Sequence, residues 1–106
     1  MIQEIVLLRR RPGMTRDEFL GYWQEIHGPL AAKLPGLRKY VQAHVLPDPF
    51  RADLPYDGIA ELWFDTPEAL HAALASPEGQ AARADLPNFL DQDKTQFLIA
   101  EEVTIV

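Results

Sequence analysis

The sequence predicts an α+β fold of the ferredoxin-like type, a four-stranded antiparallel sheet with the order β-α-β-β-α-β and helices on one face. Three observations lead to this prediction. Four segments have the apolar or alternating composition that is typical of strands. Two amphipathic stretches with helix-start signals separate the first segment from the second and the third from the fourth. The later stretch is interrupted, which predicts a broken second helix.

The composition indicates one domain over residues 1–106, because a chain of this length can bury about 65% of its unfolded surface without disulfides. The chain has no cysteine, which excludes a disulfide framework, a thiolate nucleophile and cysteine-ligated metals. The net charge of −6 argues against a nucleic-acid partner, since phosphate binding requires a basic face. No stretch is long enough to span a membrane, and Ile5–Leu8 is too short for a signal peptide, so we expect a cytoplasmic protein.

The first strand is predicted over Met1–Arg10, where apolar residues of both parities indicate that both faces are covered. A turn at residues 11–13 leads into a helix over Thr15–Leu34. The start of this helix is marked by a capping box, in which Thr15 is followed three residues later by Glu18. Its apolar face consists of Phe19, Leu20, Trp23, Ile26, Leu30, Ala31 and Leu34.

The end of this helix is expected to be irregular. Pro29 has no N–H, and its ring crowds the carbonyl of Glu25, so the helix should bend or loosen there. His27 lies within the apolar face, one turn after Trp23. An imidazole on the buried side of a weakened turn is the best functional candidate in the sequence. The alternative is a core histidine that is bonded to a backbone carbonyl.

The second strand is predicted over Leu37–Leu46, and successive side chains of a strand point to opposite faces. One face carries the hydrogen-bonding residues Tyr40, Gln42 and His44, and the other carries Lys39, Val41, Ala43 and Val45. We expect the first set to face the helices. The segment Pro47–Gly58 contains three prolines together with Phe50 and Tyr56. It is predicted to be an ordered loop that serves as a flap or wall.

The third strand is predicted over Ile59–Phe64. Thr66 and Ser76 are each followed by proline and glutamate, a pattern that places an N-cap and a first helical residue. They therefore start the two parts of the broken second helix, which ends near Ala84. The last strand is predicted over Thr95–Val106.

Two helices can cover only one face of a four-stranded sheet. The first and last strands also carry apolar residues toward the other face, so this face needs a partner. A second copy of the chain, packed sheet against sheet, is the simplest solution, and we therefore expect a homodimer.

Two stretches of the chain resemble the EthD family of the dimeric α/β-barrel superfamily: Arg10–Tyr40 and Glu61–Leu70. The specific features are the GMT-x-x-E-F start of the first helix, His27 with Pro29, the Pro-Gly-Leu turn at residues 35–37, and Tyr40. The resemblance implies a ferredoxin-like dimer.

The activities of related proteins imply a pocket but not one substrate. A similar cofactor-free isomerase of methylmuconolactone has a pocket histidine and tyrosine that match His27 and Tyr40. Related proteins are decarboxylases of polyketide aromatics, and the superfamily includes polyketide cyclases, monooxygenases and haem degraders. The family name derives from a protein associated with ether degradation by a cytochrome P450 system.

On these grounds His27 is expected to be a neutral general base, because burial disfavours its charged form. Tyr40 is expected to donate a hydrogen bond to a developing oxyanion. Five further residues are predicted to bind substrate: Trp23, Gln42, His44, Glu61 and Trp63. Glu61 must be paired, either in the pocket or at the dimer interface, because an unpartnered buried carboxylate is costly. The histidine spacings match no metal motif, so we expect no metal ion and no cofactor.

The sequence thus predicts a small homodimeric enzyme that acts on a small cyclic or aromatic molecule by cofactor-independent acid/base chemistry. Isomerisation, decarboxylation and cyclisation all belong to this class. One alternative is an oxidoreductase, either a quinol-type monooxygenase or a haem-degrading protein with His27 as the haem ligand. Another is a non-catalytic binding or accessory protein of a catabolic pathway.

Overall fold

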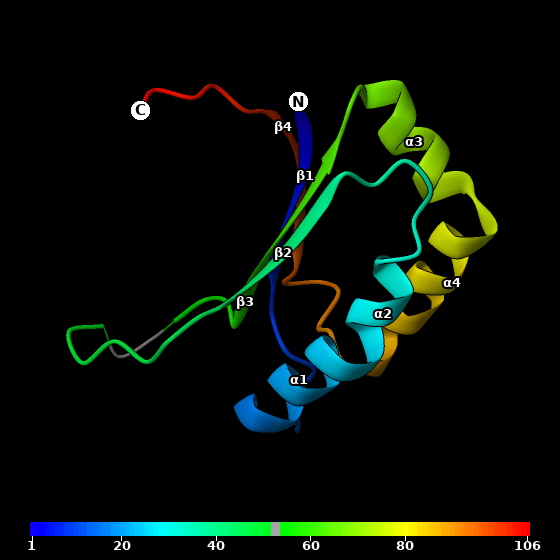
Figure 1. Cartoon of the computed structure of the whole chain (residues 1–106). Coiled ribbons are helices and arrows are strands. Elements are labelled where there is room, and N and C mark those ends of the chain that lie inside the picture. Colours follow the sequence, from blue (N-terminus) through cyan, green and yellow to red (C-terminus); the bar gives the residue numbers. More distant parts are fainter. Residues whose placement is uncertain (52–53) are drawn as a thin grey trace.

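Four antiparallel strands form one sheet in the order β2-β3-β1-β4 (Figure 1). The structure is a computed structural model, and it describes residues 1–51 and 54–106. The strands are β1 (Ile2–Leu8), β2 (Lys39–His44), β3 (Gly58–Phe64) and β4 (Gln96–Glu101). The two strands that are adjacent in sequence without a helix between them, β2 and β3, are joined by a long loop that projects from the end of the sheet (Figure 1).

The helical segments all lie on one face of this sheet (Figure 1). They are α1 (Arg16–Tyr22), the π-helical turn η1 (Trp23–His27), α2 (Gly28–Ala31), α3 (Pro67–Ala75), α4 (Pro77–Asp85) and the short 3₁₀ turn η2 (Leu86–Asn88). The order of elements confirms the predicted ferredoxin-like fold with a broken second helix. Within the part of the chain that the structure describes, no helix is both long and apolar enough to cross a membrane.

The helix starts follow the predicted local signals. Thr15 and Glu18 form the reciprocal capping box: the Glu18 N–H donates to the Thr15 hydroxyl, and the Thr15 N–H donates to the Glu18 carboxylate. The hydroxyls of Thr66 and Ser76 cap α3 and α4 by accepting from the N–H groups of Ala69 and Gly79, and each is followed by proline at the first helical position.

The first helix widens just before Pro29. The N–H of Gly28 donates to the carbonyl of Trp23, which closes a π turn over Trp23–His27. This agrees with the predicted loosening, because Pro29 cannot donate to Glu25 and its ring needs room at that carbonyl. The irregularity therefore falls on the turn that carries His27.

The core lies between the sheet and the helices and extends from Trp23, which lies over Gly58 at one end of β3, to Phe64 at the other end. The largest fully buried side chains are Trp23, Phe19, Phe64, Phe89 and Leu70. A Cβ atom on Gly58 would come within 2.4 Å of the Trp23 ring, so only glycine allows this close approach. Phe19 packs against both Trp23 and Phe89, with ring centroids 5.8 Å apart in each case.

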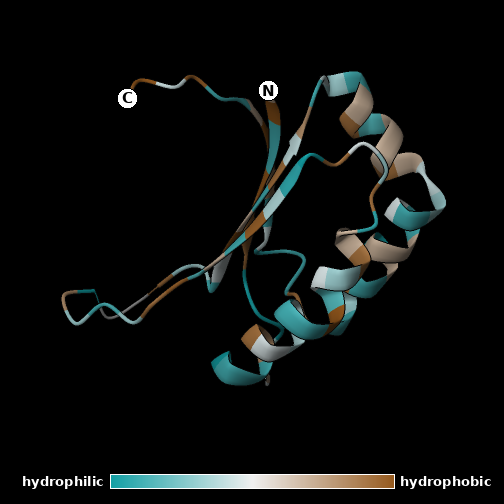
Figure 2. Cartoon of the chain, viewed as in Figure 1, coloured by the Kyte–Doolittle hydropathy of each residue, from teal (hydrophilic) through white to brown (hydrophobic). Residues whose placement is uncertain are grey.

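The opposite face of the sheet is not covered by any element among the described residues, and Figure 1 shows the helices only on the other side. By strand register it carries apolar residues from all four strands: Ile5, Leu7, Val41, Ala43, Ile59, Leu98 and Ala100. Figure 2 shows hydrophobic residues along the strands and at the C-terminal end. We refer to this side of the sheet as the open face.

The last strand is shorter than predicted. It ends at Glu101 instead of Val106, because Glu101 pairs with Ile2, the first residue of β1. Beyond this point the neighbouring strand offers only the carbonyl of Met1, which accepts from Glu102. The chain after Glu102 runs away from the sheet on the side opposite the helices (Figure 1).

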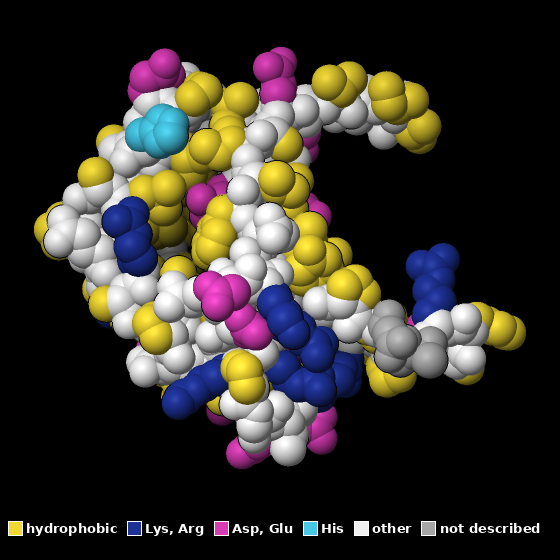
Figure 3. Space-filling model, turned by 180° about the vertical axis from the view of Figure 1, so that it is seen from behind, with side chains coloured by type: hydrophobic (Ala, Val, Ile, Leu, Met, Phe, Trp, Pro, Cys, Tyr) yellow, Lys and Arg dark blue, Asp and Glu magenta, His cyan; other side chains and the backbone are white. Residues whose placement is uncertain are grey.

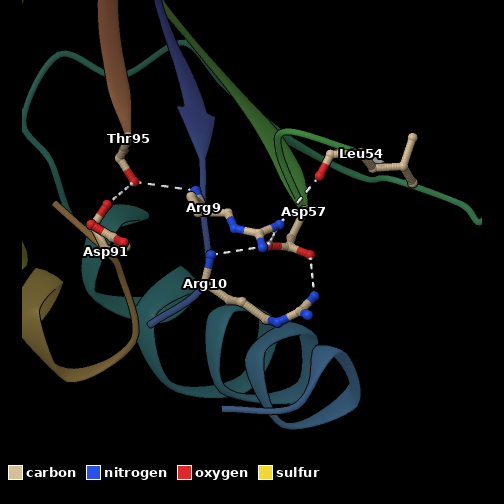
Figure 4. A network of polar contacts seen from close by, with 6 residues as sticks. All are labelled: Arg9, Arg10, Leu54, Asp57, Asp91 and Thr95. Carbon is tan, nitrogen blue, oxygen red and sulfur yellow. Dashed lines mark hydrogen bonds and ion pairs between the residues drawn. The ribbon is translucent and has the colours of Figure 1, made fainter. Parts of the chain in front are cut away.

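Asp57 anchors the β2–β3 loop to the end of β1 (Figure 4). Its carboxylate is buried and accepts from the backbone N–H of Arg10 at 2.9 Å and from the Arg10 guanidinium at 2.7 Å. Arg9 lies 3.6 Å from the same carboxylate and donates to the carbonyl of Leu54. The loop predicted over residues 47–58 is therefore fixed at its end, and its residues 52–53 lie outside the described part.

The Asp57 network yields a prediction about stability. Asp57→Ala should lower the free energy of unfolding by about 2–4 kcal/mol, because it leaves a buried backbone donor and a half-buried guanidinium without their acceptor. Urea titration followed by circular dichroism measures this change. Asp65→Ala is the matched control, since the Arg38–Asp65 pair is exposed and its loss should change stability little. Equal effects of the two substitutions would contradict the anchoring role.

Candidate functional site

A cavity of about 410 Å³ lies between the helices and the sheet. Most of its lining is apolar, with contributions from Val6, Leu8, Trp23, Leu34, Leu62, Leu74, Leu86, Leu90 and Phe97. Five polar or charged residues also line it: Glu4, His27, Tyr40, Arg83 and Gln92. Figure 3 shows an opening between the two layers, lined mostly by hydrophobic side chains, with acidic and basic side chains at its edge. This combination is typical of a small-molecule site.

His27 reaches the cavity from the π turn. Its side chain is buried against the ring of Phe89, with centroids 4.7 Å apart. Its Nδ1 lies 2.9 Å from Oδ2 of Asp85, the last residue of α4. Within residues 1–51 and 54–106 no hydrogen bond involves Nε2, so this nitrogen is available to a molecule in the cavity.

Asp85 accepts two further hydrogen bonds. The Tyr22 hydroxyl donates to Oδ1 at 2.5 Å, and the Asn88 side-chain amide donates to the same oxygen at 3.0 Å. Burial by itself would raise the pKa of Asp85, but the hydrogen bonds from Tyr22, Asn88 and His27 outweigh it and hold the pKa below its ordinary value. Asp85 is therefore a carboxylate, which can only accept.

This partner fixes the tautomer of His27. A carboxylate opposite Nδ1 requires the proton on that nitrogen, which leaves a lone pair on Nε2. Burial lowers the pKa of His27 below its ordinary value, and the hydrogen bond to Asp85 opposes this only in part. A neutral imidazole that is oriented by a carboxylate and has its free lone pair on the cavity side can accept a proton.

Tyr40 lines the same cavity from β2. Its hydroxyl oxygen accepts from Nε2 of Gln42 at 2.8 Å, so its own proton remains available to a ligand oxygen. Burial raises the pKa of the Tyr40 phenol, with the hydrogen bond from Gln42 acting in the opposite direction. The phenol therefore keeps its proton at neutral pH and can act as a donor.

The other two predicted binding residues of β2, Gln42 and His44, lie on the same helix-facing side as Tyr40 but do not line the cavity. Gln42 also donates to the carbonyl of Trp23 at 3.0 Å, and its Oε1 lies 3.1 Å from Nε2 of His44. His44 stacks on the ring of Trp23, with centroids 5.1 Å apart. Trp23 is a cavity wall, whereas Gln42 and His44 position Tyr40 and Trp23.

The structure places the predicted binding residues Glu61 and Trp63 on the open face, away from the cavity. Alternation along β3 sends Ala60 and Leu62 toward the helices and Glu61 and Trp63 to the other side. Glu61 accepts from Gln3 at 3.3 Å, and the Trp63 indole donates to Glu102 at 3.0 Å. Glu61 and Trp63 therefore do not line the cavity, and this corrects the prediction that they bind substrate there.

Three polar or charged residues of the cavity were not anticipated from the sequence: Glu4, Arg83 and Gln92. Asp85, which holds His27, was not anticipated either. The sequence does contain one indication of the role of Asp85. An acidic residue in the last turn of a helix interacts unfavourably with the helix dipole, so its presence there suggests a specific hydrogen-bonding partner. Among the described residues no group of three or more His, Asp or Glu side chains is placed to hold a metal ion.

Comparison with known proteins identifies relatives of this chain. The profile of the EthD domain matches residues 11–93. An uncharacterised 11.0 kDa protein of Rhodococcus erythropolis, encoded between thcB and thcC, is 28% identical over 85 residues, which cover 79% of this chain and 81% of that protein.

Solved structures share the fold. An EthD family protein from Bacillus halodurans has a TM-score of 0.81 at 25% identity, covering 97% of this chain and all of the other. A dimeric ferredoxin-like protein of unknown function from Thermobifida fusca has a TM-score of 0.71 at 22% identity, covering 93% and 88% of the two chains. SnoaB, a cofactor-independent oxygenase from Streptomyces nogalater, has a TM-score of 0.66 at 13% identity, covering 98% and 95%. With the domain profile matched over most of its length, the chain belongs to the EthD family.

Proposed function

We propose that this protein is a small enzyme that moves a proton on a small cyclic or aromatic molecule, with His27 as the base. The observation that carries the proposal is the Asp85–His27 pair: Asp85 holds Nδ1, Nε2 has no hydrogen bond among the described residues, and His27 lines a mostly apolar cavity. The cavity volume of about 410 Å³ suits a ligand of one or two rings.

The proposed step uses only side chains of this site. Nε2 of His27 takes a proton from an acidic O–H or C–H bond of the ligand, and the electron pair of that bond moves onto a ligand oxygen. Tyr40 donates a hydrogen bond to this oxygen, and Asp85 stabilises the imidazolium that forms. Return of the proton to a different carbon gives isomerisation. In decarboxylation the proton comes from the ligand's carboxylic acid, the bond between the carboxylate and its carbon breaks, CO₂ leaves, the electron pair of that bond forms the enolate, and the proton returns to that carbon. Attack of the enolate on a carbonyl gives cyclisation.

Oxygen-dependent oxidation is a second candidate. The same base would convert a hydroquinone or phenol into its anion, which is the electron-rich form that reacts with O₂. The fold shared with SnoaB, a cofactor-independent oxygenase, is compatible with this chemistry. Oxygen uptake is measured with hydroquinone for the wild-type protein and for His27→Gln. Uptake that depends on His27 would indicate oxidation, and its absence would leave proton transfer alone. A ligand that binds without turnover would indicate a binding protein.

We also infer that the protein is a homodimer with the open faces in contact. Val41 and Leu98 on this face are exposed by 38% and 49% although both are large and apolar. The dimeric state of the similar protein from Thermobifida fusca supports this arrangement. A specific interface of this kind should bury more than about 1,200 Å² in total.

His27→Gln tests the role of the base. The probe is para-nitrophenol, whose neutral and ionised forms have different absorption spectra. Binding to the wild-type protein should lower the apparent pKa of the probe. In His27→Gln the pKa of the bound probe should be higher than in the wild-type protein by at least about one unit, which corresponds to about 1.4 kcal/mol. With a true substrate, turnover should fall by about 10²- to 10⁴-fold.

Two further variants sharpen this test. Asp85→Asn should act in the same direction as His27→Gln, because it removes the carboxylate that orients the ring. Tyr22→Phe is the matched control, since it removes one donor to Asp85 but leaves the contact between Asp85 and His27. Unchanged ionisation of the probe in His27→Gln would rule out the proposed base.

The lowered pKa of His27 predicts how stability depends on pH. In the unfolded chain His27 has its ordinary pKa of 6.5, whereas in the folded chain its pKa is lower. As the pH falls below 6.5, the unfolded chain therefore binds a proton at His27 before the folded chain does, and the free energy of unfolding decreases. His27→Gln should flatten this part of the profile. Urea midpoints measured at several pH values for both proteins provide the test, and parallel profiles would contradict it.

Val41→Glu tests the open face. A charge at this position should dissociate the dimer or unfold the chain, because a buried unpaired carboxylate is costly. Sedimentation velocity at micromolar concentration reports the mass, for which 12.0 kDa is the monomer. Ala72→Glu on the exposed side of α3 is the control and should remain dimeric. A wild-type protein that sediments as a stable monomer would refute the inference.

A further inference from the structure

Glu4 is the one acidic side chain in the described lining of the cavity, and the proton-transfer step above does not use it. It lies on β1 and points toward the helices, as do its neighbours Val6 and Leu8 on the same strand. Within residues 1–51 and 54–106 no hydrogen bond and no ion pair involves its carboxyl group. Glu61, on the opposite face of the sheet, does have a partner in Gln3.

The strand register places Glu4 and Tyr40 in one row across the cavity floor. Glu4 pairs with Leu62 of β3, and Leu62 pairs with Tyr40 of β2. Neighbouring strands lie about 4.8 Å apart, so the Cα atoms of Glu4 and Tyr40 are separated by about 10 Å. This span suits one six-membered ring with an oxygen atom at each end, lying over Leu62.

We propose that Glu4 is a second ligand-binding residue of the cavity and that it selects ring compounds with an oxygen function at the end opposite the one held by His27 and Tyr40. This inference rests on the proposed function and adds the substrate class. Glu4 holds the second oxygen by donating a hydrogen bond from its carboxylic acid.

The surroundings of Glu4 support this form of the carboxyl group. Burial raises its pKa, and the charges of Arg83 on α4 and His71 on α3 act in the opposite direction. Both basic side chains are exposed and neither is within ion-pair distance of Glu4 in the described part of the chain. A neutral carboxyl can donate to an ether, hydroxyl or carbonyl oxygen, whereas a carboxylate cannot.

The test compares two probes of equal size and similar phenol acidity, para-methoxyphenol and para-ethylphenol. They differ only in an oxygen atom that replaces a CH₂ group at the end opposite the phenol. Dissociation constants from calorimetry at mildly acidic pH should favour para-methoxyphenol by about three- to tenfold, the value of one hydrogen bond. The preference should weaken as the pH rises and Glu4 loses its proton.

Variants assign the preference to Glu4. Glu4→Met keeps the size of the side chain without a donor and should abolish the preference, while Glu4→Gln retains an N–H donor and should keep part of it. Glu61→Met, a change of the same kind on the open face, should leave the preference intact. Circular dichroism verifies that each variant is folded.

Three results would overturn the assignment: no preference in the wild-type protein, an unchanged preference in Glu4→Met, or tighter binding of the anionic para-hydroxyphenylacetate than of para-methoxyphenol. The last result would make Arg83 the group that holds the far end of the ligand. Failure of the proposed function is seen separately, as unchanged ionisation of para-nitrophenol in His27→Gln.

Discussion

The carboxylate of Asp85 is the contact on which the arrangement of the helices depends. It is buried, and it accepts hydrogen bonds from Tyr22 of α1, His27 of the π turn and Asn88 of η2. A buried carboxylate without donors would cost several kcal/mol, so the first helix and the end of the second must pack where these donors converge. The same packing holds Nδ1 of His27 at Asp85 and places the His27 side chain in the lining of the cavity. The position of the helices and the orientation of the base are thus set by one constraint.

The order of the elements was predictable because its signals are local. A capping box starts the first helix, and Thr66 and Ser76 each start a helix with the proline that follows them. The end of β4 was not predictable in this way. Residues 102–106 have the composition of a strand, but β1 begins at Ile2 and offers no partner beyond Glu101. Strand length depends on pairing with a distant segment, which local composition does not contain.

The site was predictable to a similar extent. The helical and strand periodicities place His27 and Tyr40 on the surfaces where the two layers meet, and the structure brings both to one cavity. Asp85 is 58 residues from His27 in sequence, and neither periodicity connects the two. Alternation puts Glu61 and Leu62 on opposite faces of β3, but it does not show which of the two faces the helices cover. That choice follows from packing: Ala60, Leu62 and Phe64 all belong to the core beneath the helices.

Small side chains border part of the cavity. The aromatic rings of Phe19, Trp23 and Phe89 fill one end of the interior, whereas Ala31 and Ala60 border the hollow part. The lining of the cavity lacks the contacts that a filled core would supply. A ring-shaped ligand would restore those contacts and give His27 and Glu4 their missing partners. Ligand binding and folding stability are consequently linked, because a ligand that binds only the folded chain stabilises it.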